Sequence, residues 1–345
     1  MTNPAPFIIA EAGVNHNGDP ALALRLVDAA ANAGADAIKL QHFDPARVAA
    51  PEAGLAAYQA RNIGHPSGQR EMLASLRLDP AVLARAAERA AERSIVFLCT
   101  PFDEVSAEEI SDLVPAWKVS STDLDNLPFL DVLAATGKPL IVSSGMATME
   151  EVGDTIAFLR DRVRAMPGSL FAPVTLLHCV SAYPAPPEEV NLRAIPMLRE
   201  RLGVPVGFSD HTLGIGIAVA AATLGATIIE KHLTLDRGMP GPDHKASLGP
   251  TEFAAMTAAI RQAAAALGEP VKGPQSSETE HRISVRRGLY AAYDLAQGHV
   301  LKRGDVVALR PASEFPPRAL PDILGRRLVR GIAEGQPFSA TDFVL

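Results

Sequence analysis

The sequence predicts a (β/α)8 barrel, the TIM-barrel fold of the α/β class, followed by a small β-rich domain. Short apolar runs alternate with helical patterns eight times within the first 267 of 345 residues. The apolar residues are mainly Ala, Val, Leu and Ile, as parallel strands covered by helices require. A doubly wound open sheet is the alternative fold, but the first turn, AEAGVNHNGD at residues 10–19, is not the GxGxxG that this fold favours.

The strands are predicted from short apolar runs and the helices from the longer periodic stretches between them. The strands are expected at residues 7–11, 37–41, 95–100, 116–121, 140–144, 174–179, 206–210 and 227–232. The helices are expected at residues 21–33, 80–93, 107–114, 128–136, 149–161, 192–202, 215–224 and 250–267. Gly34, Gly137 and Gly225 each stand at a helix end just before a strand, and Asp79 with Pro80 reads as an N-cap and first helical residue.

The periodic pattern stops after residue 267. We therefore expect a barrel domain at 1–268, a Gly-, Pro- and Ser-rich linker at 269–283 and a second domain at 284–345. That second domain has three short β-like pieces, GLYAAYDL, VVALRP and RRLVRGI, separated by turns. At roughly 60 residues it would be marginal alone and would gain stability from docking.

The composition excludes several classes of protein. A net charge of −7 gives no general attraction to nucleic acid or to anionic membranes. No segment has the roughly 18 uninterrupted apolar residues of a membrane span, and the N-terminus lacks the pattern of a signal peptide. Cys99 and Cys179 lie in apolar runs, where buried thiols are expected rather than a disulfide. We expect a soluble cytoplasmic protein.

Two predicted strands end in a histidine, His211 after the seventh and His232 after the eighth. Because strand side chains alternate, Glu230 and His232 share one face while Lys231 points to the other. Each histidine alone could be only a hydrogen-bonded strand end. Together they favour one divalent metal ion with open coordination positions.

The other strand ends carry cations and hydroxyl groups. Lys39 and Lys118 lie on apolar strands and are expected to point inward, where hydroxyls from Thr100, Ser121 and Ser143 could complete a cradle for phosphate and carboxylate. A surface position or a Schiff-base role is the alternative for each lysine.

Glu11, at the end of the first strand, could pair with Lys39, bind a substrate hydroxyl or transfer a proton. The two cysteines lack an activating neighbour and are expected in the core, as are Phe97 and Trp117.

These residues belong to motifs that resemble, in this order, the sialic acid (N-acetylneuraminate or nonulosonate) synthase family. The motifs are AEAGVNHNGD (10–19), ADAIKLQ (35–41), CTPFD (99–103), WKVSS (117–121), SSGMAT (143–148), LLHCVSAYPAP (176–186), GFSDHT (207–212), IEKH (229–232) and PGPDHKAS (240–247). The tail, RRGLYAAYDLAQGHVLKRGDV, resembles the C-terminal antifreeze-like (SAF) domain of that family.

The resemblance implies an enzyme that condenses phosphoenolpyruvate with an N-acylated hexosamine such as N-acetylmannosamine, releasing phosphate. It implies a divalent metal on His211 and His232, usually Mn²⁺, with Mg²⁺ or Co²⁺ as alternatives. It maps phosphoenolpyruvate contacts to Lys39, Thr100, Lys118, Ser121, Ser143 and Ser209, and sugar contacts to Glu11, Gln41, Tyr183, Asp243 and Arg310. The catalytic set is Glu11, Lys39, Lys118, His211, Glu230 and His232, with either Glu11 or Glu230 moving a proton. Arg310 would reach the site of the partner subunit in a domain-swapped homodimer.

Two departures from the family pattern leave the acceptor open. Ser181 stands where bacterial sialic acid synthases often carry asparagine, and Ser120 replaces a glycine. A 2,4-diacetamido hexose, giving legionaminic or pseudaminic acid, is therefore an alternative acceptor. The alternatives of another class are a Schiff-base aldolase on the same barrel and a non-catalytic binding protein.

Overall fold

The computed structural model describes residues 5–63, 68–164 and 167–344. The chain divides into two units, 1–269 and 270–345, and each is described by itself. Among the described residues, no helix combines the length and apolar character needed to span a membrane.

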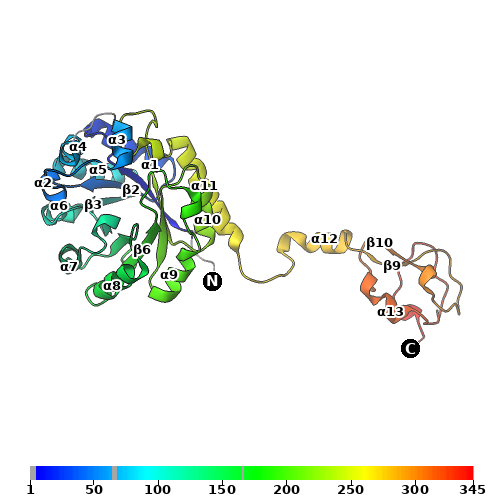
Figure 1. Cartoon of the computed structure of the whole chain (residues 1–345). Coiled ribbons are helices and arrows are strands. Elements are labelled where there is room, and N and C mark those ends of the chain that lie inside the picture. Colours follow the sequence, from blue (N-terminus) through cyan, green and yellow to red (C-terminus); the bar gives the residue numbers. More distant parts are fainter. Residues whose placement is uncertain (1–4, 64–67, 165–166, 345) are drawn as a thin grey trace. The chain divides into compact units, whose positions relative to one another are not determined.

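The first unit is a barrel of eight parallel strands with helices around it (Figure 1). The strands are β1 (Phe7–Gly13), β2 (Ala37–His42), β3 (Val96–Pro101), β4 (Trp117–Val119), β5 (Leu140–Ser143), β6 (Val174–Cys179), β7 (Val206–Asp210) and β8 (Ile228–His232). They pair in the order β3-β2-β1-β8-β7-β6-β5-β4, and β3 and β4 at the two ends also contact each other. The sheet therefore curves round on itself, which confirms the predicted barrel rather than the open sheet.

The outer helices lie close to their predicted positions. They are α1 (Pro20–Asn32), α5 (Pro80–Glu92), α6 (Glu104–Ile110), α7 (Leu127–Ala135), α8 (Met149–Arg160), α9 (Ala194–Leu202), α10 (Gly216–Thr223) and α11 (Pro250–Leu267). Asp79 caps α5 as predicted, and its carboxylate accepts from the Ala81 amide. The helix expected at 107–114 starts earlier, because the Asp103 side chain accepts from the Ser106 amide and caps α6 there. It also ends earlier, in the 3₁₀ turn η1 (Ser111–Leu113).

Three short helices between β2 and β3 were not predicted: α2 (Pro45–Val48), α3 (Ala57–Ile63) and α4 (Gln69–Leu76). We call them together the β2–β3 cap. Residues of α3 and α4 form a small core with Val14 and Phe43, separate from the main core under the outer helices. Asp44 caps α2 just before Pro45, the same Asp-Pro signal that begins α5.

The second unit contains one antiparallel pair, β9 (Gly288–Ala291) with β10 (Val306–Leu309), and its own apolar core. Its helices are α12 (Thr279–Ser284) and α13 (Leu320–Ile323). The third β-like piece expected from the sequence, RRLVRGI, forms only isolated bridges. The segment expected as a linker at 269–283 contains the 3₁₀ turn η5 (Ser276–Glu278) and most of α12.

Lys231 lies on the outer face of β8 and has a charged partner of its own there. Lys231 points away from the barrel interior, as predicted, and its Nζ lies 2.8 Å from Asp210 Oδ2 with both side chains fully buried. Burial penalises each charge, so the pair is tolerated only because each compensates the other. It locks β7 to β8 directly behind the two strand-end histidines.

We expect Lys231→Met to destabilise the barrel by about 3–5 kcal/mol, because it leaves the Asp210 carboxylate buried without its cation. Urea unfolding followed by the fluorescence of Trp117, the single tryptophan, reports on this unit. Arg237→Met is the matched control: Arg237 lies 3.7 Å from Glu252 at the surface, and its loss should cost at most about 1 kcal/mol. Equal losses in the two variants would contradict the role given to the buried pair.

Candidate active site

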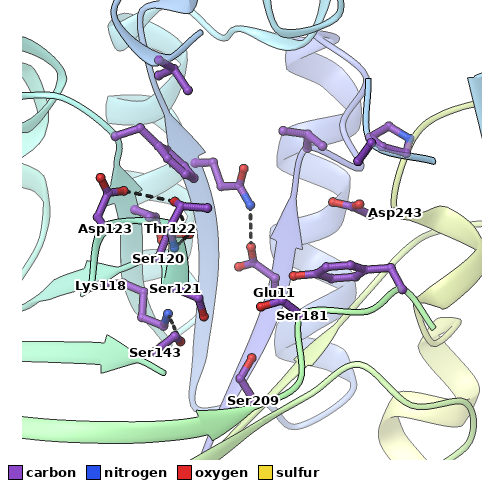
Figure 2. Close-up of a pocket in the computed structure, with 18 of the residues that line it drawn as sticks. Glu11, Lys118, Ser120, Ser121, Thr122, Asp123, Ser143, Ser181, Ser209 and Asp243 are labelled. Atoms are coloured by element: carbon purple, nitrogen blue, oxygen red, sulfur yellow. Dashed lines mark hydrogen bonds between the residues drawn. The ribbon is translucent and has the colours of Figure 1, made fainter. Parts of the chain in front are cut away.

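A cavity of about 650 Å³ opens at the C-terminal ends of the strands. It brings together every barrel residue that the sequence singled out as a site residue; Figure 2 labels several of them. These residues are Glu11, Lys39, Gln41, Thr100, Lys118, Ser121, Ser143, Tyr183, Ser209, His211, Glu230, His232 and Asp243.

The floor of the cavity holds four buried charged side chains from β1, β2, β4 and β8. Lys39 Nζ lies 3.0 Å from Glu11 Oε2 and 3.4 Å from Glu230 Oε2, and Lys118 Nζ lies 3.8 Å from Glu230 Oε1. We call Glu11, Lys39, Lys118 and Glu230 the charge cluster. Lys39 and Lys118 are 4% and 2% exposed, so both lysines point inward as predicted and neither is a surface residue.

Burial and mutual attraction set the ionisation of the cluster. Burial raises the pKa of Glu11 to about 7, against the opposing effect of Lys39. Burial acts to raise the pKa of Glu230 as well. The attraction of Lys118 and Lys39 outweighs burial there and lowers the pKa of Glu230 to about 2. Burial lowers the pKa of Lys118 to about 8, while Glu11 and Glu230 outweigh burial at Lys39 and raise its pKa. Glu230 is thus held as a carboxylate between two ammonium groups.

Hydroxyl groups surround the two lysines. Lys118 Nζ donates to Ser143 Oγ at 2.7 Å (Figure 2) and to the Val119 carbonyl oxygen at 3.0 Å. Lys39 Nζ donates to Thr100 Oγ1 at 3.2 Å. Ser121 Oγ accepts from the Gly145 amide at 2.9 Å, which leaves its proton to donate. Ammonium and hydroxyl donors therefore converge as an anion with several oxygens requires.

His211 and His232 line the cavity beside each other, with their ring centroids 5.5 Å apart. His211 Nδ1 lies 2.6 Å from the Val180 carbonyl oxygen and so carries the proton, which leaves the lone pair on Nε2. The buried Nδ1 of His232 has no hydrogen-bond partner among the described residues. Burial lowers the pKa of both rings, so both are neutral near pH 7.

The two histidines offer two neutral nitrogen ligands to a divalent metal ion, which is fewer than such an ion needs. A backbone carbonyl that accepts from the second ring nitrogen is the arrangement that orients metal-binding histidines. Within residues 5–63, 68–164 and 167–344, no group of three or more His, Cys, Asp or Glu side chains could hold a metal. The remaining ligands would have to be substrate oxygens or water.

Asp243 enters the cavity on the loop that follows β8. Ser247 Oγ donates to the Asp243 carbonyl oxygen at 2.7 Å, and Asn15 Nδ2 donates to Ser247 Oγ at 2.9 Å. The loop after β1 therefore holds the Asp243 loop in place. Burial raises the pKa of Asp243 to about 6.

Several cavity residues were missed in the sequence. One set comes from the β2–β3 cap and from the residue just before α3: Arg47, Val48, Ala56, Gln59, Gln69, Met72, Leu73 and Leu76. The Asp44-Pro45 cap signal could have found this segment. A polar set after β4 was also missed: Thr122, Asp123 and Asn126. Ser120 and Ser181, which the sequence singled out as departures from the family pattern, line the cavity as well. Cys179 was expected only in the core, but it also lines the cavity, with Sγ 3.3 Å from Ser121 Oγ.

The sequence did not assign His178 to the site, and this residue is not among those that line the cavity. His178 is on the opposite side of β6, where Nε2 lies 2.7 Å from the Val190 carbonyl oxygen. Arg310 belongs to the second unit, where it follows β10 and is exposed.

Comparison with known proteins matches both units. The NeuB family profile matches residues 26–272, and the SAF domain profile matches residues 286–344. The N,N′-diacetyllegionaminic acid synthase of Legionella pneumophila is 40% identical over 331 residues, covering 95% of this chain and 92% of that protein. That of Campylobacter jejuni is 38% identical, covering 96% and 98%. The crystal structure of the N-acetylneuraminic acid synthetase of Leptospira borgpetersenii is 33% identical, with a TM-score of 0.69, covering 81% of this chain and 90% of that chain.

If the histidine pair binds a metal, His211→Ala and His232→Ala should each weaken Mn²⁺ binding at least about tenfold, since even the loss of a partner of a ligand has effects of this size. Free Mn²⁺ is measured by electron paramagnetic resonance during titration of the protein, without any substrate. His178→Ala is the matched control, because His178 has the same type of backbone bond outside the cavity. Unchanged Mn²⁺ affinity in both cavity variants would contradict this site.

Proposed function

The chain belongs to the NeuB family, and we propose that it joins phosphoenolpyruvate to an N-acylated hexosamine and water to form a nonulosonic acid, such as a sialic acid, and phosphate. The main support for this proposal is the charge cluster together with the hydroxyl groups around its two lysines. Two buried ammonium groups beside Thr100, Ser121 and Ser143 match a small molecule that carries both a carboxylate and a phosphate.

In the proposed reaction, Lys39 and Lys118 hold the phosphate and carboxylate so that C3 of phosphoenolpyruvate faces the aldehyde carbon of the open-chain sugar. The C2–C3 double bond of phosphoenolpyruvate supplies the electron pair of a new carbon–carbon bond, and the aldehyde oxygen takes up a proton and becomes a hydroxyl. Positive charge then develops at C2 of the phosphoenolpyruvate part, where water adds and loses a proton. The resulting tetrahedral centre expels phosphate, its new hydroxyl gives up its proton to the departing phosphate, and a ketone remains.

His211 and His232 would hold a divalent metal ion, and we propose Mn²⁺. When bound, it would supply Lewis acidity at the aldehyde oxygen of the sugar. The lone pair on His211 Nε2 and the neutral state of both rings support this assignment.

Of the two carboxyl groups in the charge cluster, we propose that Glu11 is the one that gives and takes protons during the reaction. Glu230 lies within 4 Å of both lysines and accepts from Ser209 Oγ at 2.9 Å, so it is fixed as a negative charge. In the part of the chain that the structure describes, Lys39 is the cation paired with Glu11, which also accepts from Gln41 Nε2 at 3.0 Å. A carboxyl group with a pKa near the working pH transfers protons most effectively.

N-acetylmannosamine is the first acceptor to consider, and a 2,4-diacetamido hexose is the second. The second candidate is supported by the relatives named N,N′-diacetyllegionaminic acid synthase. We also propose a cytoplasmic location, supported by the two free, buried cysteines, Cys99 and Cys179, which suit a reducing compartment.

The direct test is phosphate release from phosphoenolpyruvate with Mn²⁺ and each acceptor in turn. We expect release that depends on an acceptor and stops when EDTA removes the metal. An acceptor-dependent reaction that survives EDTA, with substrate trapped on Lys39 or Lys118 by borohydride, would replace this proposal with Schiff-base chemistry. No release with any acceptor from folded, metal-loaded protein would contradict the proposed function.

We further propose that the chain works as a domain-swapped homodimer in which Arg310 of one subunit binds the N-acyl group in the site of the other. Arg310→Ala should then raise the KM of the acceptor about tenfold or more, the loss expected for one charged hydrogen bond, while Mn²⁺ binding stays unchanged. Arg318→Ala, another arginine of the same unit, is the control. An unchanged acceptor KM, or a monomeric active enzyme in sedimentation, would contradict this arrangement.

A further inference from the structure

A tyrosine ring packs against both histidines of the candidate metal site. The ring centroids of Tyr183 and His211 lie 4.2 Å apart, with 33° between the two ring planes. The centroids of Tyr183 and His232 lie 5.7 Å apart, and those planes are nearly perpendicular at 89°. Because the two histidine rings are themselves 5.5 Å apart, the three rings form a closed triangle in which each contacts the other two.

The segment that carries Tyr183 also fixes His211 in two other ways. This segment, residues 180–185 directly after β6, we call the β6 loop. The Val180 carbonyl oxygen lies 2.6 Å from His211 Nδ1 and accepts its proton, and the Ala185 amide donates to the His211 carbonyl oxygen at 2.9 Å. Tyr183 lies between these two residues in the chain. One loop therefore holds the backbone, one ring nitrogen and the ring surface of His211.

The hydrogen bond from Nδ1 does not fix the plane of the His211 ring by itself. A carbonyl oxygen accepts hydrogen bonds over a broad range of directions, so the ring can tilt while the bond is kept. Tilting moves Nε2, which is the nitrogen whose lone pair is available to a metal ion. A second aromatic ring packed against the imidazole restricts that tilt. Nε2 then stays where the structure places it, 3.4 Å from Ser209 Oγ and beside the cavity.

We propose that Tyr183 is a positioning residue for the metal site: its ring holds His211 at the angle at which Nε2 and His232 bind one divalent cation together. This inference rests on the proposed function, which places a metal ion on these two histidines. The role belongs to the aromatic ring. It is separate from the sugar contact that family resemblance implies for Tyr183, because a polar contact with a sugar would use the hydroxyl group.

Two physical effects make the packed ring favour the cation-bound form. Ligands that already point at one position lose less conformational freedom when the cation binds, so the cation is bound more tightly. An imidazole that binds a cation also becomes electron-poor, and the face of a tyrosine ring attracts positive charge. The contact between the two rings is therefore stronger with the cation bound than without it. Groups that orient a metal ligand typically change metal affinity by about tenfold to a hundredfold.

The test measures the Mn²⁺ affinity of the full chain by electron paramagnetic resonance, with no substrate present. Tyr183→Leu removes the ring and should weaken Mn²⁺ binding about tenfold. Tyr183→Phe keeps the ring and removes the hydroxyl, so it should bind Mn²⁺ as the wild type does. Phe102→Leu is the matched control, because Phe102 is a half-buried aromatic residue that lines the same cavity but packs on Phe43. Its Mn²⁺ affinity should equal that of the wild type.

Urea unfolding followed by the fluorescence of Trp117 checks that each variant is folded, and Tyr183→Met replaces Tyr183→Leu if the latter is not. Wild-type Mn²⁺ affinity in the folded non-aromatic variant would overturn the role of the ring. Equal losses in that variant and in Tyr183→Phe would overturn it too, since the hydroxyl would then be the group that matters. A wild type that binds no Mn²⁺, or whose Mn²⁺ affinity is unchanged by His211→Ala and His232→Ala, would instead reject the metal site of the proposed function.

Discussion

The organisation of the barrel interior depends on the burial of four charges within a few ångströms. Burying an ammonium or a carboxylate alone is prohibitive, so Lys39 and Lys118 can stay charged only beside Glu11 and Glu230. Glu11, Lys39 and Glu230 lie on the neighbouring strands β1, β2 and β8, and Lys118 on β4 joins them because the two ends of the sheet meet. The two ammonium groups lose their hydration when the protein folds. They are therefore already desolvated and oriented when an anion binds.

Strand alternation divides the polar residues of β7 and β8 between two tasks. Ser209, Glu230 and His232 face the cavity, while Asp210 and Lys231 form a buried pair on the other side. The pair behind the sheet fixes β7 and β8 against each other. The histidines at the ends of those strands are therefore placed by a contact that itself takes no part in the chemistry.

Residues with a regular period could be predicted from the sequence, and residues placed by irregular segments could not. Lys39 and Gln41 share a face because strands alternate, and the same rule separates Lys231 from His232. Met72 and Leu73 escaped prediction because the β2–β3 cap is made of short helices, whose few apolar positions give little periodicity. The start of α6 was placed late because the Asp103 cap, not an apolar pattern, sets it. The function given to Arg310 came from family resemblance alone, since no local pattern points from the second unit to a site in the barrel.

The proposed function depends on the claim that the buried lysines form the anion site. Calorimetric titration of the wild type and Lys118→Met with phosphoenolpyruvate, without acceptor, tests it most directly. Loss of one charged hydrogen bond should weaken Kd about tenfold to a hundredfold. Lys138→Met, which removes a partly buried lysine outside the cavity, should keep the wild-type Kd. Equal affinity in the wild type and Lys118→Met would contradict the claim.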